Sequence, residues 1–163
     1  MNKIVEEALK WEGKEFHPGV SAQCAEWVST ILDAAGVKGQ DYKHTAWCPD
    51  LATAGEYVRT MSELQPGDIV LFDNTYMVAT FTHVGIYIGD GDMIHRNTME
   101  APVQKAYIKS DYWMEKFNQG RRFTLEPPAK KNLLKIFYHN GKCKVIVNGT
   151  EFPVKGIDAQ IEY

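Results

Sequence analysis

The apolar positions follow a helical period near the start of the chain and a strand period later on. Ile4, Ala8 and Trp11 recur at intervals of four and three, which places them on one face of a helix over residues 1–11. A second stripe runs through residues 21–36 and consists of Cys24, Trp27, Val28, Ile31, Leu32 and Ala35. The two stripes predict amphipathic helices that bury their apolar faces in a common core.

Both ends of the second helix carry residues that favour helix termini. Ser21 suits the N-cap position, because its hydroxyl can accept a hydrogen bond from the first turn. Gly36 suits the position after the C-terminus, where a left-handed backbone conformation is common. Cys24 is therefore expected in the first helical turn, on the buried side of the helix.

After a short predicted helix near residues 51–58, the pattern becomes typical of strands separated by tight turns. The apolar run 69–72 predicts a buried strand, and residues 83–89 predict a second one. The turn at 90–92 joins this second strand to a return strand that begins at residue 93. Further strands are expected over 103–108 and 121–125, with a helical turn over 112–117. We predict an α+β domain in which N-terminal helices pack on an antiparallel sheet.

The C-terminal part of the chain differs from the rest. Residues 126–131, Glu-Pro-Pro-Ala-Lys-Lys, are typical of a linker between a domain over 1–125 and a small β appendage over 132–163. Asn-Gly pairs at 140–141 and 148–149 indicate hairpins within the appendage. A three-stranded unit of this size is marginally stable by itself, so we expect it to need further packing.

The composition excludes several classes of protein. The chain has 163 residues, of which 44% are hydrophobic and 24% charged, as in an ordinary globular protein. The net charge of −3 and the lack of a basic stripe argue against nucleic-acid binding. No apolar run approaches the length of about 20 residues that crosses a bilayer, so no membrane span is expected. The sequence gives no indication of the oligomeric state.

The first ten residues contain no recognisable secretion signal. Glu6 and Glu7 lie where such a signal would need its apolar run. We therefore expect a protein that is made in the cytoplasm and reaches any extracellular substrate by release or delivery.

Three cysteines and two histidines carry the candidate chemistry. Cys24, Cys48 and Cys143 are widely spaced and form no CxxC pair, which argues against a structural zinc site or a disulfide framework. His83 opens one predicted strand, and His95 lies on the adjacent antiparallel strand, so the two imidazoles are expected to be close. We expect no metal or other cofactor to be required.

A thiol at the start of a helix and opposite a histidine is suited to nucleophilic catalysis. An unperturbed thiol, with a pKa of about 8.5, is mostly protonated at neutral pH. The positive end of the Cys24 helix and an imidazolium at His83 both favour the thiolate. His83 can then return a proton to a leaving amine, while a third polar group such as His95 fixes its ring plane.

Several segments, in order along the chain, resemble a known family. They are Gln23-Cys-Ala-Glu-Trp-Val28, Ala34-Ala-Gly-Val37, Leu64-Gln-Pro-Gly-Asp-Ile-Val-Leu-Phe72, His83-Val-Gly-Ile-Tyr-Ile-Gly-Asp-Gly-Asp-Met-Ile-His95 and Tyr112-Trp-Met-Glu-Lys-Phe-Asn-Gln-Gly-Arg-Arg-Phe123. The chain resembles the NlpC-type cell-wall cysteine peptidases, a branch of the papain-like superfamily and a sister group of the CHAP amidases. The likeness covers roughly the first three-quarters of the chain.

The resemblance implies a papain-like fold and a reaction. The expected function is hydrolysis of amide bonds in the stem peptides of peptidoglycan, through an acyl-enzyme on Cys24. By the same resemblance, His83 is the base and His95 the third polar residue. The expected partner is therefore a peptidoglycan peptide substrate.

The surroundings of Cys24 depart from the family pattern. The family usually has Asp-Cys-Ser-Gly, whereas this chain has Gln-Cys-Ala-Glu. The family's tyrosine upstream of the nucleophile, which helps to hold the oxyanion, has no match, because Phe16 is nearest and lacks a hydroxyl. Ser21, Gln23 or a backbone N–H group is therefore the candidate oxyanion donor. We place Ser21, Gln23 and Trp47 as candidate substrate-binding residues.

Each candidate residue also has a structural interpretation. Cys24 alone would be a small buried residue, His83 a satisfied core histidine and His95 a cap of the hairpin. Cys48 is expected to be structural or to line the cleft. The combination of both histidine strands with the Pro-Gly-Asp turn favours catalysis. Gln-Cys is more like the CHAP amidases, where the third group is often a carboxylate, and Glu100 is the alternative to His95 in that case.

Two other classes of function remain open. One is a thiol-dependent acyltransferase, and the other is a wall-binding module that kept the fold without turnover. Three biological settings fit a chain without a secretion signal: a phage endolysin, a delivered antibacterial effector, and an excised domain of a larger secreted enzyme.

Overall fold

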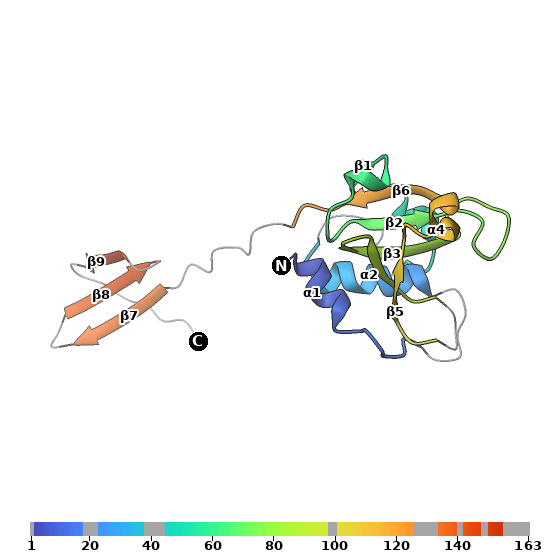
Figure 1. Ribbon diagram of the computed structural model, residues 1–163. Coiled ribbons are helices and arrows are strands. Elements are labelled where there is room, and N and C mark those ends of the chain that lie inside the picture. Colours follow the sequence, from blue (N-terminus) through green and yellow to red (C-terminus); the bar gives the residue numbers. More distant parts are fainter. Residues whose placement is uncertain are drawn as a thin grey trace. The chain divides into compact units, whose positions relative to one another are not determined.

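The computed structural model describes residues 2–17, 23–37, 45–97 and 101–125, together with three strands within 134–154 (Figure 1). The chain divides into two compact units, Met1–Glu126 and Pro127–Tyr163.

In the described part of the first unit, a six-stranded antiparallel sheet has the order β1-β6-β2-β3-β4-β5. Its strands are β1 (Glu56–Val58), β2 (Ile69–Phe72), β3 (His83–Gly89), β4 (Asp92–His95), β5 (Gln104–Tyr107) and β6 (Phe117–Arg122). Every residue of β2 is buried, because the strand has neighbours on both sides and side chains on both faces. The predicted strands at 69–72 and 83–89 are confirmed.

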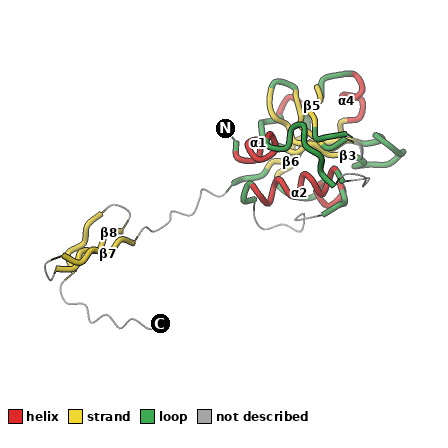
Figure 2. The backbone as a smooth tube through the Cα atoms, turned by 90° about the horizontal axis from the view of Figure 1, so that it is seen from below, coloured by secondary structure: helices red, strands yellow, loops and turns green. Residues whose placement is uncertain are grey.

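Helices lie on both faces of this sheet (Figures 1 and 2). Helices α1 (Lys3–Leu9) and α2 (Cys24–Ala34) pack on β3 from one side, and α4 (Asp111–Lys116) lies on the other side. Between α2 and the sheet the core contains Ile4, Trp27, Val28, Ile31, Val84, Ile86 and Ile94. On the α4 side it contains Val70, Phe72, Tyr87, Met93, Ile108 and Trp113. The stripes that predicted α1 and α2 therefore do face the core.

The ends of α2 confirm one sequence prediction and correct another. Gly36 has φ +85° and donates its N–H to the Asp33 carbonyl, while Val37 donates to the Leu32 carbonyl. This pair of bonds is a Schellman motif, which ends the helix as predicted. The prediction of Ser21 as N-cap is wrong, because Gln23 occupies that position and makes no side-chain capping bond.

The predicted helix near residues 51–58 is also wrong. The helix there is a single turn, α3 (Cys48–Leu51), which has Pro49 in its first turn, where proline is tolerated. Gly55 then adopts φ +65°, and the following residues form β1, which pairs with β6. A Cβ at Gly55 would lie 2.5 Å from the Arg122 carbonyl oxygen, so the close approach of this segment to β6 needs glycine. Pairing with β6 therefore outweighs the local helical pattern.

The closing strand begins four residues earlier than the predicted 121–125. The strand β6 starts directly after α4 and lies between β1 and β2, not at the edge of the sheet. A short 3₁₀ helix (Met61–Glu63) connects β1 to the Pro-Gly-Asp turn before β2.

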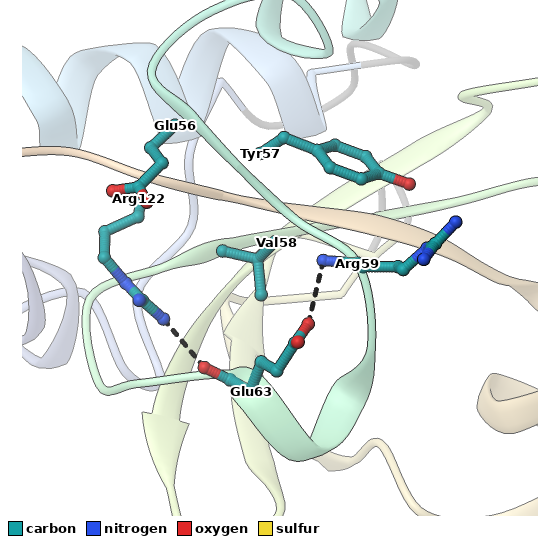
Figure 3. Close-up of a pocket in the computed structure, with 6 residues that line it drawn as sticks. All are labelled: Glu56, Tyr57, Val58, Arg59, Glu63 and Arg122. Carbon is teal, nitrogen blue, oxygen red and sulfur yellow. Dashed lines mark hydrogen bonds between the residues drawn. The ribbon is translucent and has the colours of Figure 1, made fainter.

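Asp68 ties the Pro-Gly-Asp turn to β6. Its buried carboxylate accepts the Gln65 N–H and two hydrogen bonds from Arg122, from Nε at 2.9 Å and from NH2 at 2.7 Å. The same NH2 group donates to the Glu63 carbonyl at 2.7 Å (Figure 3). These bonds hold the turn against β6.

The second unit contains a three-stranded antiparallel sheet among its described residues. Its strands are β7 (Leu134–His139), β8 (Lys142–Val147) and β9 (Thr150–Val154), in the order β7-β8-β9. They correspond to the strand-like segments of the predicted appendage. The Asn-Gly turns that were expected to join them lie outside the described residues.

Within the described residues, no helix has the length and apolarity needed to span a membrane.

Candidate active site

Cys24 is the first residue of α2, next to the start of β3. A residue at the first helical position has an N–H group with no carbonyl partner in its own helix, and it lies at the positive end of the helix dipole. Cys24 has an exposed fraction of 7%, and the Val84 backbone N–H donates a hydrogen bond to its sulfur. The fold therefore places a thiol where an anion is favoured.

The β3–β4 hairpin brings His83 and His95 into direct contact. Their ring nitrogens, Nε2 of His83 and Nδ1 of His95, lie 2.8 Å apart, and both rings are buried. Gly85 makes this approach feasible, because a Cβ at that position would lie 3.2 Å from Cβ of His95. His95 is the last residue of β4, whereas the sequence predicted it near the start of that strand.

The three side chains that were predicted to be catalytic therefore lie together. Nε2 of His83 bonds to His95, which leaves Nδ1 of His83 for the Cys24 sulfur, to which this ring is hydrogen bonded. The resulting order is thiol, imidazole and orienting imidazole. Their catalytic roles remain predictions.

The surroundings of Cys24 favour its thiolate. The pKa of Cys24 is held well below its ordinary value, first by a hydrogen bond from the Cys48 thiol and then by the hydrogen bond and positive charge of His83. The Val84 N–H adds to this effect, and burial opposes it.

His95 is neutral in the folded protein. Burial, and then the positive charge of His83, lower the pKa of His95 to about 3. A neutral His95 can accept a proton at Nδ1 in a hydrogen bond from Nε2 of His83. The ring of His83 is thereby oriented without a second charge being introduced.

Cys48, which is expected from the sequence to be structural or to line the cleft, lies against Cys24. Its sulfur lies 3.7 Å from that of Cys24, and both thiols are buried. The hydrogen bond to Cys24, together with burial, raises the pKa of Cys48, so it is a protonated donor. No sequence motif links the two thiols, because their contact depends on how α3 packs beside α2.

Trp113 forms one wall of the histidine pair. Its ring stacks on His83 with centroids 5.6 Å apart and an interplanar angle of 29°, and it meets His95 edge-on at 5.4 Å. Phe72 also packs on Trp113, with ring centroids 4.6 Å apart. The contact between Trp113 and His83 could not be predicted from the sequence, because nothing in the spacing of the α4 residues indicates a contact with β3.

Arg96 introduces a buried positive charge near Cys24. It follows His95 directly and is 2% exposed. Burial lowers the pKa of Arg96, whereas the negative charge of Cys24 acts in the opposite direction. The sequence analysis missed this residue, since a single arginine after a strand carries no signal of burial.

The other residues named from the sequence differ in burial, and two of them are not described. Gln23 is half-buried, and its Oε1 is a buried acceptor with no hydrogen-bond partner among the described residues. Trp47 is 65% exposed and directly precedes Cys48. Ser21 and Glu100 lie outside the described residues. Phe16 packs edge-on against Trp11 in the core.

In the part of the chain that the structure describes, no group of three or more His, Cys, Asp or Glu side chains is arranged to hold a metal ion. A pocket of about 260 Å³ lies at the β1–β6 edge, away from the thiol (Figure 3). Its lining residues are Glu56, Tyr57, Val58, Arg59, Glu63 and Arg122.

A thiol at a helix N-terminus, paired with a histidine on an antiparallel sheet, defines the papain-like class of fold and site. The model of the NlpC/P60 family matches residues 7–122, and the chain belongs to this family. The resemblance found in the sequence is thereby confirmed.

Curated relatives include wall-degrading enzymes. The chain is 32% identical over 119 residues to the bifunctional muramidase/DL-endopeptidase CwlT of Bacillus subtilis. This match covers 69% of this chain and 33% of the relative. It is 31% identical over 135 residues to the gamma-DL-glutamyl hydrolase of the same organism, and this match covers 79% of this chain and 31% of the relative. Thus the chain spans about one third of the length of these two relatives.

A third relative is matched over more of its length. The murein DD-endopeptidase MepS/murein LD-carboxypeptidase of Escherichia coli is 36% identical over 126 residues, covering 74% of this chain and 62% of the relative. Among solved structures, an NLP/P60 family protein of Staphylococcus aureus superposes with a TM-score of 0.58 and 26% identity. That match covers 77% of this chain and 41% of the other. The predicted papain-like α+β fold is confirmed.

The depressed pKa of Cys24 has a measurable consequence for alkylation. We expect iodoacetamide to modify Cys24 at a rate that changes little from about pH 8 to about pH 6, because the thiolate persists where an ordinary thiol is protonated. Cys48 should react more slowly, since its pKa is raised. Peptide mapping of the alkylated chain gives the rate at each thiol.

The His83→Ala variant is the control for the alkylation profile. It should make alkylation of Cys24 slower and more dependent on pH, because the charge and hydrogen bond of the ring are lost. Equal rates at all three cysteines of the parent chain would contradict an activated thiol.

Trp113 is expected to act as a positioning residue for His83. Trp113→Ala should lower kcat by about tenfold or more, because the imidazole loses the surface that fixes its plane, whereas KM should change little. Trp113→Phe keeps an aromatic face and should restore most of the rate. Steady-state kinetics on a soluble wall peptide measure both constants, and an equal loss in the Ala and Phe variants would contradict the positioning role.

Proposed function

We propose that this chain hydrolyses amide bonds in the stem peptides of peptidoglycan through an acyl-enzyme on Cys24. The observation that carries the proposal is a chain of hydrogen bonds from Cys24, at the start of α2, to His83 and from His83 to His95 in the β3–β4 hairpin. Membership of the NlpC/P60 family and the names of the relatives support a wall peptide as substrate.

In the first half of the reaction, the Cys24 thiolate attacks the carbonyl carbon of the scissile amide and a C–S bond forms. The carbonyl oxygen becomes an oxyanion, for which the Cys24 backbone N–H and the Nε2 group of the half-buried Gln23 side chain are candidate donors. His83 gives its proton to the leaving nitrogen, and the C–N bond breaks. The product is a thioester on Cys24 and a free amine.

In the second half, water attacks the thioester carbonyl and His83 accepts the proton of that water. The C–S bond breaks, the acid product leaves and the thiolate is restored. His95 remains neutral throughout and holds the His83 ring through the bond between Nε2 and Nδ1. None of these steps requires a metal ion.

The names of the relatives define the bonds to be tested. CwlT is a DL-endopeptidase, and MepS is named for both DD-endopeptidase and LD-carboxypeptidase activity. The purified chain should be incubated with muropeptides of defined stem length and cross-linking, and the products identified by mass spectrometry. A new amine and a new carboxylate at one position identify the bond.

A binding measurement with wall fragments and an assay with an ester or thioester donor separate the alternatives. Tight binding of wall fragments without products would select the wall-binding module. Transfer of an acyl group from an ester or thioester donor, with wall peptides untouched, would select the acyltransferase. We further propose that the chain acts on the cell wall after release or delivery, with a phage endolysin, a delivered antibacterial effector and an excised domain of a larger secreted enzyme as the three settings that fit.

A further inference from the structure

A second thiol contacts the nucleophile, and the hydrolytic mechanism gives that thiol no bond to make or break. The sulfurs of Cys48 and Cys24 lie 3.7 Å apart, and each cysteine is 7% exposed. Because an S–S bond is about 2.05 Å long, the two sulfurs need to approach by only about 1.7 Å to be joined.

We propose that Cys48 is a resolving thiol, which captures the oxidised form of Cys24 as a reversible Cys24–Cys48 disulfide. This disulfide removes the nucleophile and at the same time protects it from irreversible oxidation. The proposal concerns the two sulfurs alone and does not depend on which substrate Cys24 attacks.

The first step is the oxidation of Cys24 by hydrogen peroxide. The Cys24 thiolate attacks one peroxide oxygen, an S–O bond forms and the O–O bond breaks. The sulfur is oxidised by two electrons to a sulfenic acid, and the peroxide is reduced to hydroxide. Thiolate character decides which cysteine reacts, and the depressed pKa of Cys24 makes it the reactive one of the pair.

In the second step, the Cys48 sulfur attacks the sulfenic sulfur. An S–S bond forms, the S–O bond breaks, and the departing hydroxide takes the Cys48 proton and leaves as water. The hydrogen bond to Cys24 is the main cause of the raised pKa of Cys48. Conversion of Cys24 to an uncharged sulfenic acid weakens that cause, so Cys48 becomes a better nucleophile when it is needed.

Reduction reverses the switch. A dithiol such as dithiothreitol attacks the disulfide, restores both thiols and leaves as the oxidised cyclic dithiol. In contrast, a sulfenic acid without a partner thiol proceeds to sulfinic and sulfonic acids, which dithiols do not reduce. The presence of Cys48 should therefore decide whether oxidation of Cys24 is reversible.

The test begins with the full chain carrying Cys143→Ser, which leaves Cys24 and Cys48 as its only thiols. The protein is treated with hydrogen peroxide, its mass is measured, and non-reduced peptides are mapped. We expect a mass lower by two hydrogens, a linked peptide pair that contains Cys24 and Cys48, and recovery of both free thiols after dithiothreitol. A gain of oxygen atoms at Cys24 without the linked pair would overturn the proposal.

A matched variant tests the role of Cys48 directly. In the chain with Cys48→Ser and Cys143→Ser, the same treatment should add two or three oxygens to Cys24, and dithiothreitol should not restore its alkylation by iodoacetamide. Cys48→Ser also removes the hydrogen bond that most favours the Cys24 thiolate, so the peroxide dose is adjusted until the same fraction of Cys24 is lost in both proteins, and recovery is counted over that fraction only. Equal recovery of Cys24 in both proteins would overturn the resolving role.

Because Cys48 is buried, a further control tests whether its replacement unfolds the protein. Circular dichroism and thermal unfolding show whether the serine variant is folded, and Cys48→Ala provides a second variant without a resolving thiol. Peptide mapping of the chain that retains Cys48 does not depend on either substitution. All these measurements are independent of wall hydrolysis, so failure of the switch and failure of the proposed function are distinguishable.

Discussion

Replacing Cys24 by alanine is expected to lower hydrolysis of wall peptides by about 10³-fold or more, because no other group in the site can form the acyl-enzyme. His83→Ala should have a similar effect, since it removes both the proton donor to the leaving amine and a charge that stabilises the thiolate. The measurement is the rate of product release from a defined muropeptide, followed by mass spectrometry.

The loss of hydrolysis rate should be smaller for His95 than for Cys24 and His83. His95→Ala is expected to cost about 10²-fold, because His83 remains but loses the bond that orients it. Cys143→Ser, in the second unit, serves as the control and should retain the parent rate. If Cys24→Ala released products as fast as the parent chain, the acyl-enzyme mechanism would be wrong.

The second large effect concerns stability and the Asp68–Arg122 pair. Arg122→Ala should lower the free energy of unfolding by about 3–5 kcal/mol, because it leaves the Asp68 carboxylate buried without its charged partner. Asp68→Ala should cost less, because the Arg122 side chain is 28% exposed and can be hydrated. Urea unfolding of both variants and of the double variant gives the coupling energy of the pair.

An exposed ion pair on the same unit provides the matched control. Lys105 and Glu12 lie 2.9 Å apart with both side chains nearly half exposed, so Lys105→Ala should change the free energy of unfolding by less than about 1 kcal/mol. Equal losses for Arg122→Ala and Asp68→Ala would contradict burial of Asp68 as the cause.

Strongly periodic segments could be predicted from the sequence, and segments governed by distant pairing could not. The stripes of α1 and α2 and the apolar runs of β2 and β3 were assigned correctly, because each buries a continuous face. The segment at 51–58 was assigned incorrectly, because β1 exists only through its hydrogen bonds to β6, about sixty residues later.

The candidate site divides in the same way. Contact between His83 and His95 could be predicted because a tight turn places neighbouring antiparallel strands side by side. Contact between Cys24 and Cys48, and the stacking of Trp113 on His83, could not be predicted, since neither is encoded in a local pattern.

The sequence by itself therefore determined the family, the packing of N-terminal helices on an antiparallel sheet, and the three residues proposed for catalysis. The helices and strands follow from local periodicity, the His83–His95 contact follows from one short hairpin, and the family follows from the resemblance of several motifs in order along the chain. Only the tertiary structure decided what surrounds Cys24: the Cys48 thiol, the Trp113 ring and the buried Arg96 charge. These groups come from separate elements, and only the packing of those elements against β3 and α2 brings them near one sulfur.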